Sequence, residues 1–336
     1  MEVIVEGYGL YLGKKSERLV IKKGKDVLEE HPLMNIERVT ITSMGVSIST
    51  DLLKDCTERG IIINLLSWGG KPYAMITSPH LTGTVITRRE QFRAYDDQRG
   101  IEYGRSIVTG KIKNQINTLK YSSKYRKQSA PGVYKLIYEK ISKMNEIMSE
   151  ASKVTGKNID EVRGTLLSIE GRASQYYWQG IKEILDEDID FPGREHRGAT
   201  DPVNSLLNYG YGILCSRIWG ALLLAGLEPY CGFIHVDRPG KASLVYDAVE
   251  EFRQPVVDRV VLAFINRKGQ VEIDKEGMLE EKCKKNFAGK IIERLDAHEK
   301  YEGKKYTIKT IIQRQTRKLA SFLRNEGRFD PFICSW

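Results

Sequence analysis

The chain contains 336 residues, of which 53 are Lys or Arg and 44 are Asp or Glu, so its formal net charge is +9. This basic balance favours a polyanionic partner. The five cysteines are odd in number and form no C-x-x-C pair, which argues against a disulfide framework or structural zinc site and indicates a reducing compartment. The longest apolar run, residues 218–227, is about half as long as a bilayer crossing requires. We therefore expect a cytoplasmic protein outside the membrane.

Strand-like segments dominate the first 78 residues. Apolar and polar side chains alternate there, and β-branched residues are frequent, as in half-buried strands. Residues 13–16 are expected to form a hairpin turn, and Gly60 is expected to stop the helix of this region. The predicted strands are 3–5, 8–12, 19–21, 39–41, 46–48, 61–66 and 73–76, and the predicted helix is 50–59.

From Arg88 onward the spacing of apolar residues is helical. Residues 191–200 contain Pro, Gly and charged side chains and are expected to form a loop. Asp201 then has the position of an N-cap, and Pro202 that of the first helical residue. The predicted helices are 88–119, 133–151, 159–169, 174–185, 202–225, 241–253 and 311–324.

The length of the chain favours two domains, because single cores usually stop growing near roughly 250 to 300 residues. The change from strand-like to helical spacing predicts an α+β protein. We expect a small β domain at residues 1–78, a linker at 79–87 and a larger all-α-helical domain at 88–336.

Basic residues gather in two stretches. Residues 282–324 contain 13 basic and 4 acidic side chains, so this window carries as much net charge as the whole chain. A second stretch runs from Arg88 to Lys127. Either stretch alone is equally well explained as a solvated helix face. Together with a candidate metal site, the two favour nucleic acid as the partner.

Four residues have the chemistry of a divalent-metal site. Asp247 and Glu250 are three apart, which on a helix places both carboxylates on one side, within reach of a shared ion. His235 stands in an apolar segment followed by Pro-Gly, and Glu170 follows an apolar run, where a buried carboxylate needs a cation or a proton. An imidazole and two or three carboxylates suit an ion that acts on phosphodiesters.

Each of these residues also has a purely structural explanation. A lone histidine such as His235 is more often a hydrogen-bonded core residue than a ligand. Glu170 can pair with a nearby basic residue, and Asp247 and Glu250 can form a charged helix face. The sequence contains no H-E-x-x-H, G-x-S-x-G, G-x-G-x-x-G or P-loop motif, which argues against the other common chemistries.

Several longer segments are similar to one family. They are SIEGRAS, which contains Glu170, DPVNSLLNYGYGIL at residues 201–214, GLEPYCGFIH at 226–235, and SLVYDAVEEFRQPVVD at 243–258. In this order they resemble the CRISPR-associated adaptation integrases, the Cas-one family. The similarity extends through the N-terminal β region and covers nearly the whole chain.

The resemblance implies a β-sandwich-like N-terminal domain for dimerisation and DNA contact, an α-helical catalytic domain and a symmetric homodimer. In the family, two such dimers flank a dimer of the small partner Cas-two. The family's catalytic metal ligands map onto Glu170, His235 and Glu250, although many relatives have Asp at the last position. Whether Asp247 binds the ion directly stays open.

The implied reaction is transesterification, in which the 3′-hydroxyl of captured double-stranded DNA attacks a phosphodiester at the edge of a CRISPR repeat. A Mg²⁺ or Mn²⁺ ion would activate the attacking oxygen and neutralise charge on the phosphorane oxygens. Because an imidazole ligand is softer than the all-oxygen set that Mg²⁺ prefers, we expect higher activity with Mn²⁺. No covalent protein nucleophile is required.

Basic residues are expected to hold the DNA by its phosphates. Arg238, Lys241 and Arg253 lie close in sequence to the proposed ligands, although they can instead pair with neighbouring carboxylates. Affinity should fall steeply with salt and depend little on DNA sequence. The amphipathic C-terminal helix is predicted to present three further cations outward: Arg314, Arg317 and Lys318.

Two rival functions share these features. A metal-dependent nuclease acting on branched or damaged DNA would use the same ligands, because hydrolysis and strand transfer differ only in whether water or a 3′-hydroxyl attacks. A non-catalytic DNA-binding scaffold would have a degenerate site. The intact set of Glu170, His235 and Glu250 argues against the scaffold, whereas only product analysis separates the nuclease from the integrase.

Overall fold

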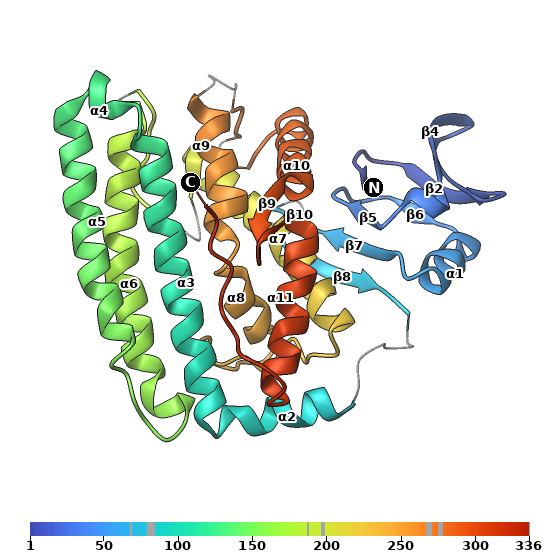
Figure 1. The fold of residues 1–336 in the computed structure, drawn as a ribbon. Coiled ribbons are helices and arrows are strands. Elements are labelled where there is room, and N and C mark those ends of the chain that lie inside the picture. The colour runs from blue at the N-terminus through green and yellow to red at the C-terminus, as the bar shows by residue number, and fades with distance from the viewer. Residues whose placement is uncertain are drawn as a thin grey trace. The chain divides into compact units, whose positions relative to one another are not determined.

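The computed structural model describes residues 1–67, 69–78, 85–186, 188–195, 199–266, 271–274 and 278–335. The chain divides into two compact units, one formed by residues 1–81 and 208–216 and the other by residues 82–207 and 217–336. Strands form most of the first unit and helices most of the second (Figure 1). The α+β class is therefore confirmed. The first unit also includes residues 208–216, which the linear boundary at 78 did not anticipate.

Two four-stranded sheets form the first unit. One has the order β1-β5-β7-β8, with β8 antiparallel to its parallel neighbours, and the other has the order β4-β3-β2-β6. Both contribute apolar side chains to one buried core. The face-to-face packing of a β-sandwich stays a prediction. The strands are β1 (Glu2–Val5), β2 (Leu10–Lys15), β3 (Arg18–Lys23), β4 (Asp26–Pro32), β5 (Arg38–Ile41), β6 (Ser47–Ile48), β7 (Ile62–Leu66) and β8 (Pro72–Ile76), and a 3₁₀ turn, η1 (Leu33–Asn35), follows β4.

Some strands and turns of this unit differ from the predicted ones for local reasons. Strand β4 was not predicted because its first four side chains are exposed and give no apolar alternation. The predicted hairpin turn lies later than expected, since Gly13 is inside β2 and Ser16, with a φ of 53°, makes the turn. Helix α1 (Thr50–Glu58) begins after the N-cap Ser49 and ends before Gly60, whose φ is 70°, as predicted.

Long helices form most of the second unit. Helices α3, α5 and α6 pack side by side (Figure 1). The residues predicted as a linker fall on positions 79–84, which lie outside the described residues, and on the start of α2. The elements are α2 (Val85–Tyr95), α3 (Gln98–Ser123), α4 (Arg126–Ser129), α5 (Pro131–Ala151), α6 (Ile159–Ile184), α7 (Pro202–Leu224), α8 (Ser243–Val249), η2 (Arg253–Asp258), α9 (Arg259–Asn266), α10 (Glu281–Asp296), β9 (His298–Tyr301), β10 (Lys304–Thr307) and α11 (Ile308–Leu323).

Caps decide where these helices break. The predicted helix 88–119 is two helices, because the Asp97 side chain accepts a hydrogen bond from Arg99 N (2.8 Å) and starts α3. The two helices predicted at 159–185 are one, α6, in which Gly171 is accommodated without a break. Asp201 caps α7 by accepting from Asn204 N (2.8 Å), as predicted.

The segment predicted as one helix at 241–253 is more complex. Helix α8 ends at Val249, Glu250 is its C-cap, and a π-helix, η2, follows after a short turn. Pro255 lies inside η2 and has no N–H to continue an α-helical ladder. Asp247 and Glu250 therefore stand at the end of a helix, where their side chains can take different directions. Single π-turns are frequent at functional sites.

Two further observations concern the cysteines and the apolar helices. All five cysteines are free. Within the described ranges, no helix is both long and apolar enough to cross a bilayer.

Candidate active site

Asp247 of α8 organises the chain around His235. Its side chain is completely buried and accepts hydrogen bonds from the backbone N–H groups of Phe233 (2.6 Å), Ile234 (3.1 Å) and His235 (2.9 Å). It also accepts from His235 Nδ1 (2.7 Å). Each carboxylate oxygen thus receives two hydrogen bonds, which fills the acceptor capacity of the group. Asp247 is a positioning residue for the histidine, with no lone pair left for an ion.

This contact fixes the tautomer of His235. An ionised carboxylate only accepts hydrogen bonds, so Nδ1 carries a hydrogen, and in the neutral ring Nε2 then keeps the lone pair. Metal-binding histidines commonly have this arrangement, in which a carboxylate orients the ring and makes the ligand nitrogen more basic. The geometry therefore suits His235 Nε2 as a ligand.

Glu170 and Glu250 meet at the ammonium group of Lys111. Lys111 is on α3, Glu170 is on α6 and Glu250 ends α8. Lys111 Nζ lies 2.7 Å from Glu250 Oε2 and also contacts Glu170 Oε1. Glu170 Oε1 accepts a further hydrogen bond from Ser174 Oγ (2.8 Å), and Glu250 Oε1 lies 3.3 Å from Arg253 Nη2. Two carboxylates from separate helices thus already converge on one cation.

The cations around Glu250 control its ionisation. Burial by itself would raise the pKa of this carboxyl, but the attraction of Arg253 and Lys111, with a smaller contribution from His235, lowers the pKa to about 2. Burial disfavours the charged form of Lys111 and so acts to lower its pKa. The attraction of Glu250 and Glu170 is stronger, and the pKa of Lys111 is raised. Glu250 and Lys111 are therefore both charged at neutral pH.

Glu251, the next residue, has the opposite environment. It is buried and accepts hydrogen bonds from Phe332 N (2.8 Å) and Gln315 Nε2 (2.6 Å). Burial raises its pKa to about 7 despite these bonds. Asn114 of α3 donates to the backbone carbonyls of Glu251 and Phe332, both at 2.9 Å. Glu251 and Asn114 thus anchor the C-terminal segment beside the candidate site.

The arrangement of the His, Cys, Asp and Glu side chains shows how this cluster could hold a metal ion. Among the described residues, no three His, Cys, Asp or Glu side chains converge closely enough to hold one. Two of the three predicted ligands already share a cation, however, because Lys111 contacts both Glu170 and Glu250. With an oriented imidazole close enough to affect the pKa of Glu250, the cluster offers the oxygen and nitrogen donors that a divalent ion takes.

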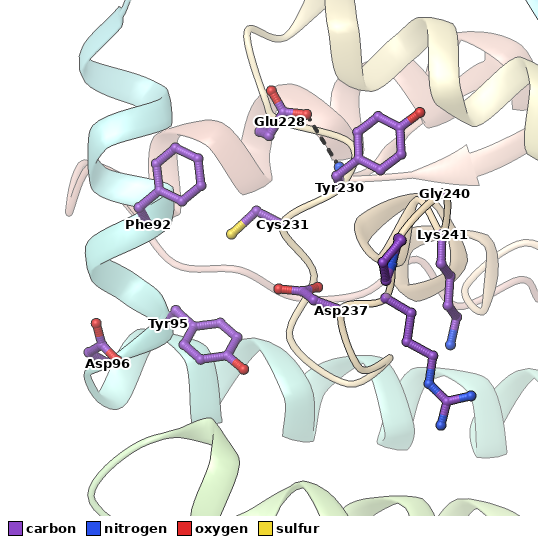
Figure 2. Close-up of a pocket in the computed structure, with 11 residues that line it drawn as sticks. Phe92, Tyr95, Asp96, Glu228, Tyr230, Cys231, Asp237, Gly240 and Lys241 are labelled. Atoms are coloured by element: carbon purple, nitrogen blue, oxygen red, sulfur yellow. Dashed lines mark hydrogen bonds between the residues drawn. The ribbon is translucent and has the colours of Figure 1, made fainter.

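A pocket of about 820 Å³ lies beside the segment that carries His235. Figure 2 shows Phe92 and Tyr95 of α2 on one side of it and Tyr230, Asp237 and Lys241 on the other. Arg238, a predicted DNA contact, also lines this pocket and is exposed. The structure thus places Arg238 and Lys241 together at an open surface near the site.

The other predicted DNA contacts have varied environments. Arg253 is only 17% exposed and pairs with Glu250, so its charge is used inside the cluster. On α11, Arg317 is exposed, and Arg314 and Lys318 each lie 3.3 Å from Glu302. The predicted apolar side of this helix is buried, as expected: Ile311, Ile312, Gln315, Leu319, Phe322 and Leu323.

From the sequence, Lys111 was interpreted only as part of a basic stretch and Glu251 only as part of a possible charged helix face, and Asn114 was not singled out. A signal for Lys111 was available, because it continues the face of α3 formed by Gly104, Ile107 and Val108, all of which are buried. A lysine in line with an apolar stripe requires a buried partner. Asn114, one turn further on, had no comparable signal.

The fold and the site together define an α+β protein with a buried cluster of mixed charge in its helical unit. A family model described as "CRISPR associated protein Cas1" matches residues 3–293. The chain belongs to this family. Its relatives include the CRISPR-associated endonuclease Cas1 1 of Archaeoglobus fulgidus, 36% identical over 100% of both chains. A protein of the same name from Francisella tularensis subsp. novicida is 34% identical over 99% of both chains.

Solved structures share the fold at low identity. A casposase bound to integration product matches with a TM-score of 0.82 and 22% identity, covering 98% of this chain and 92% of that one. A Cas1 protein from Thermotoga maritima matches with a TM-score of 0.77 and 19% identity, covering 99% and 100%. A chain of a Cas6-RT-Cas1–Cas2 complex matches with a TM-score of 0.77 and 22% identity, covering 99% of this chain and 36% of that one.

Proposed function

We propose that this chain is a metal-dependent DNA integrase and endonuclease of CRISPR adaptation. It would join the 3′-hydroxyls of captured DNA to the CRISPR repeat by transesterification in the cytoplasm. Membership of the Cas1 family supports this function, as do relatives named endonucleases and a fold shared with a casposase bound to integration product. The observation that carries the proposal is the oriented His235 beside two glutamates that converge on one cation.

Each residue of the site has a distinct part. Glu170, His235 and Glu250 would hold a Mg²⁺ or Mn²⁺ ion, and Asp247 orients the histidine through Nδ1. When bound, such an ion polarises the phosphodiester and offsets the charge that develops on it. Arg253 pairs with Glu250 Oε1 at 3.3 Å, and the other oxygen of this carboxylate, Oε2, contacts the ammonium group of Lys111.

The bond changes follow from this arrangement. The 3′-hydroxyl of the incoming strand loses its proton to solvent as its oxygen forms a new bond to phosphorus, and the oxygen of the repeat strand leaves with the electrons of the broken bond and takes up a proton. The number of phosphodiesters stays constant, so no external energy source is needed. Water in place of the 3′-hydroxyl would give hydrolysis at the same site, which is the nuclease activity that the relatives' names indicate.

An imidazole ligand affects the choice of ion. Mg²⁺ prefers oxygen ligands, whereas Mn²⁺ accepts nitrogen more readily. We therefore expect higher activity with Mn²⁺ than with Mg²⁺ when both are saturating. Equal or lower activity with Mn²⁺ would count against His235 as a ligand.

The proposed partners are double-stranded DNA, a second copy of the chain and the small protein Cas2. Matches to chains from a Cas6-RT-Cas1–Cas2 complex and from a Cas1–DNA complex support the DNA and Cas2 partners. The exposed cations Arg238 and Arg317 are suited to bind phosphates without reading the base sequence.

A strand-transfer assay tests the function. The purified chain is combined with its Cas2 partner, a short duplex with 3′-hydroxyls and a supercoiled plasmid that carries a repeat, in Mn²⁺. Native protein is expected to join the duplex covalently to the plasmid, and His235→Ala is expected to lose this product. His298→Ala, which removes an exposed histidine of β9, is the matched control and should remain active.

The products distinguish the alternatives. Nicking of the plasmid without joining would favour the nuclease over the integrase. Full joining by His235→Ala would overturn the metal site, and a native chain that binds DNA without joining or nicking would favour the scaffold.

A further inference from the structure

Lys111 places an ammonium group at the centre of the buried cluster. Its side chain is 9% exposed and contacts Glu170 and Glu250, which are 22% and 7% exposed. These two glutamates come from separate elements, α6 and the end of α8. Without a cation between them, two negative charges would face each other in a poorly solvated site, at a high cost in free energy. Lys111 is therefore their counter-ion.

We propose that Lys111 occupies the position of the divalent ion in the metal-free protein and that metal binding displaces its ammonium group from Glu170 and Glu250. The inference rests on the proposed function, because these glutamates are the proposed ligands. Lys111 is then a positioning residue with two effects. It stabilises the empty site, and it lowers the affinity for the ion by competing for the same oxygens.

The charges of the cluster support an exchange. Lys111 and Arg253 already balance Glu170 and Glu250. An added divalent ion between these carboxylates would lie within about 4 Å of the ammonium group, a separation at which like charges repel strongly in a partly buried site. Lys111 can withdraw because its charge is at the end of a flexible four-carbon stem. Arg253 contacts the other oxygen of Glu250 and can remain.

Two details of the geometry are those of a replaceable contact. Lys111 Nζ lies 2.7 Å from Glu250 Oε2 and also contacts Glu170 Oε1, so one ammonium group holds both glutamates. No three acidic, histidine or cysteine side chains of the described chain converge on a point. Both follow if the ammonium group holds the glutamates apart from His235 until a metal ion draws the three together.

Calorimetric titration with Mn²⁺, without DNA, tests the exchange. Lys111→Met keeps an unbranched side chain, one heavy atom shorter, and removes its charge. The dissociation constant for Mn²⁺ is expected to fall about tenfold or more, because the competing cation is gone. In EDTA the variant is expected to melt at a lower temperature than the native chain, and Mn²⁺ is expected to raise its melting temperature by more.

Lys113→Met is the matched control, since it removes the same charge from an exposed position of the same helix. Its Mn²⁺ affinity and melting temperature should equal those of the native chain. If Lys111→Met does not fold in EDTA, Lys111→Gln is measured in its place, because its amide can donate one hydrogen bond to a glutamate without a charge. The same tenfold tightening is expected.

Glu170→Gln separates failure of this inference from failure of the proposed function. If the native chain binds Mn²⁺, Glu170→Gln does not, and Lys111→Met binds no tighter, the metal site stands and the exchange is wrong. Weaker binding by Lys111→Met would also overturn the exchange, since Lys111 would then support the ion. If neither the native chain nor Lys111→Met binds Mn²⁺, both proposals fall.

Discussion

Two glutamates of the helical unit each contact two cations, and burial makes them different. Glu250 is 7% exposed and lies between Lys111 and Arg253. Glu302 is 45% exposed and lies between Arg314 and Lys318. Buried ion pairs are costly to break, because the remaining partner is left as an uncompensated charge, whereas exposed pairs contribute about 0 to 1 kcal/mol.

The buried charges around Glu250 hold one another in place, whereas the exposed charges around Glu302 can contact another molecule. Around Glu250 each charged group is held by buried contacts with its neighbours. Around Glu302 the pairs are weak, and Arg314 and Lys318 can exchange their carboxylate for a phosphate at little cost. The same residue types would therefore serve the proposed catalysis in one region and the proposed DNA binding in the other.

The largest difference is expected between Glu250→Gln and Glu302→Gln. Removing the buried carboxylate should reduce strand transfer roughly a thousandfold or more and destabilise the fold by about 3 kcal/mol, because a proposed metal ligand and the partner of Arg253 are lost together. Removing the exposed one should leave activity unchanged and stability within about 0.5 kcal/mol. Equal effects of the two substitutions on strand transfer and on stability in chemical denaturation would contradict the expected difference between the buried and the exposed glutamate.

Asp247→Asn should show that the cluster works through orientation. An amide that replaces the carboxylate cannot satisfy His235 Nδ1 and three backbone N–H groups equally well. Strand transfer and Mn²⁺ affinity are expected to fall about 10- to 100-fold, as for other residues that orient a metal-binding histidine.

Asp258→Asn is the matched control for this variant. Asp258 is also buried and accepts a hydrogen bond from Tyr177 Oη (2.7 Å). Its loss should lower stability without a change in Mn²⁺ affinity. A loss of affinity in both variants would indicate general unfolding instead of a specific role for Asp247.

Glu251 is also buried, but no cation of the described residues forms an ion pair with it. Its pKa is about 7 in the folded protein, against an ordinary value of 4.5. The folded state therefore keeps the proton longer than the unfolded state, and stability from the protonated group is lost as pH rises from about 4.5 to 7. Glu251→Gln cannot lose a proton, so its stability relative to the native chain should increase by roughly 3 kcal/mol across this window.

Urea denaturation from pH 4.5 to 8 measures this effect. Glu139→Gln, which replaces an exposed carboxylate of α5, serves as the control and should follow the native curve. If the Glu251→Gln curve also runs parallel to the native curve, Glu251 is already ionised in the folded protein and the pH effect is wrong.

The smallest effect is expected at the exposed cations of α11. Replacing Arg314, Arg317 and Lys318 together by Ala should weaken binding of any DNA duplex about tenfold at moderate salt and make the salt dependence shallower, because fewer phosphate contacts release fewer counterions. Fluorescence anisotropy over a range of salt concentrations measures both.

The control triple variant removes the same charge from exposed or partly exposed positions of α5: Lys135, Lys140 and Lys143. It should keep the native affinity and salt dependence. If both triple variants bind equally weakly, net charge explains the affinity and the α11 cations have no special part.

The accuracy of the sequence-based predictions depended on how local the cause was. The N-caps Ser49 and Asp201 and the buried side of α11 follow from neighbouring residues, and short patterns indicated the positions of these helices. Strand β4 was missed because its first four side chains are exposed and give no apolar alternation, although its backbone pairs with β3. The end of α8 before Glu250 also escaped prediction, since the helical spacing continues past it.

The residue types of the site, the Cas1 family and the α+β class could be predicted from the amino-acid sequence alone, because they depend on short motifs and on the local order of residues. The contacts of each charged group could be known only from the folded chain. In the fold, Asp247 accepts a hydrogen bond from His235, and Lys111 lies between Glu170 and Glu250. These contacts join residues 12 to 139 positions apart in the chain. Their energies depend on burial, which no short stretch of sequence contains.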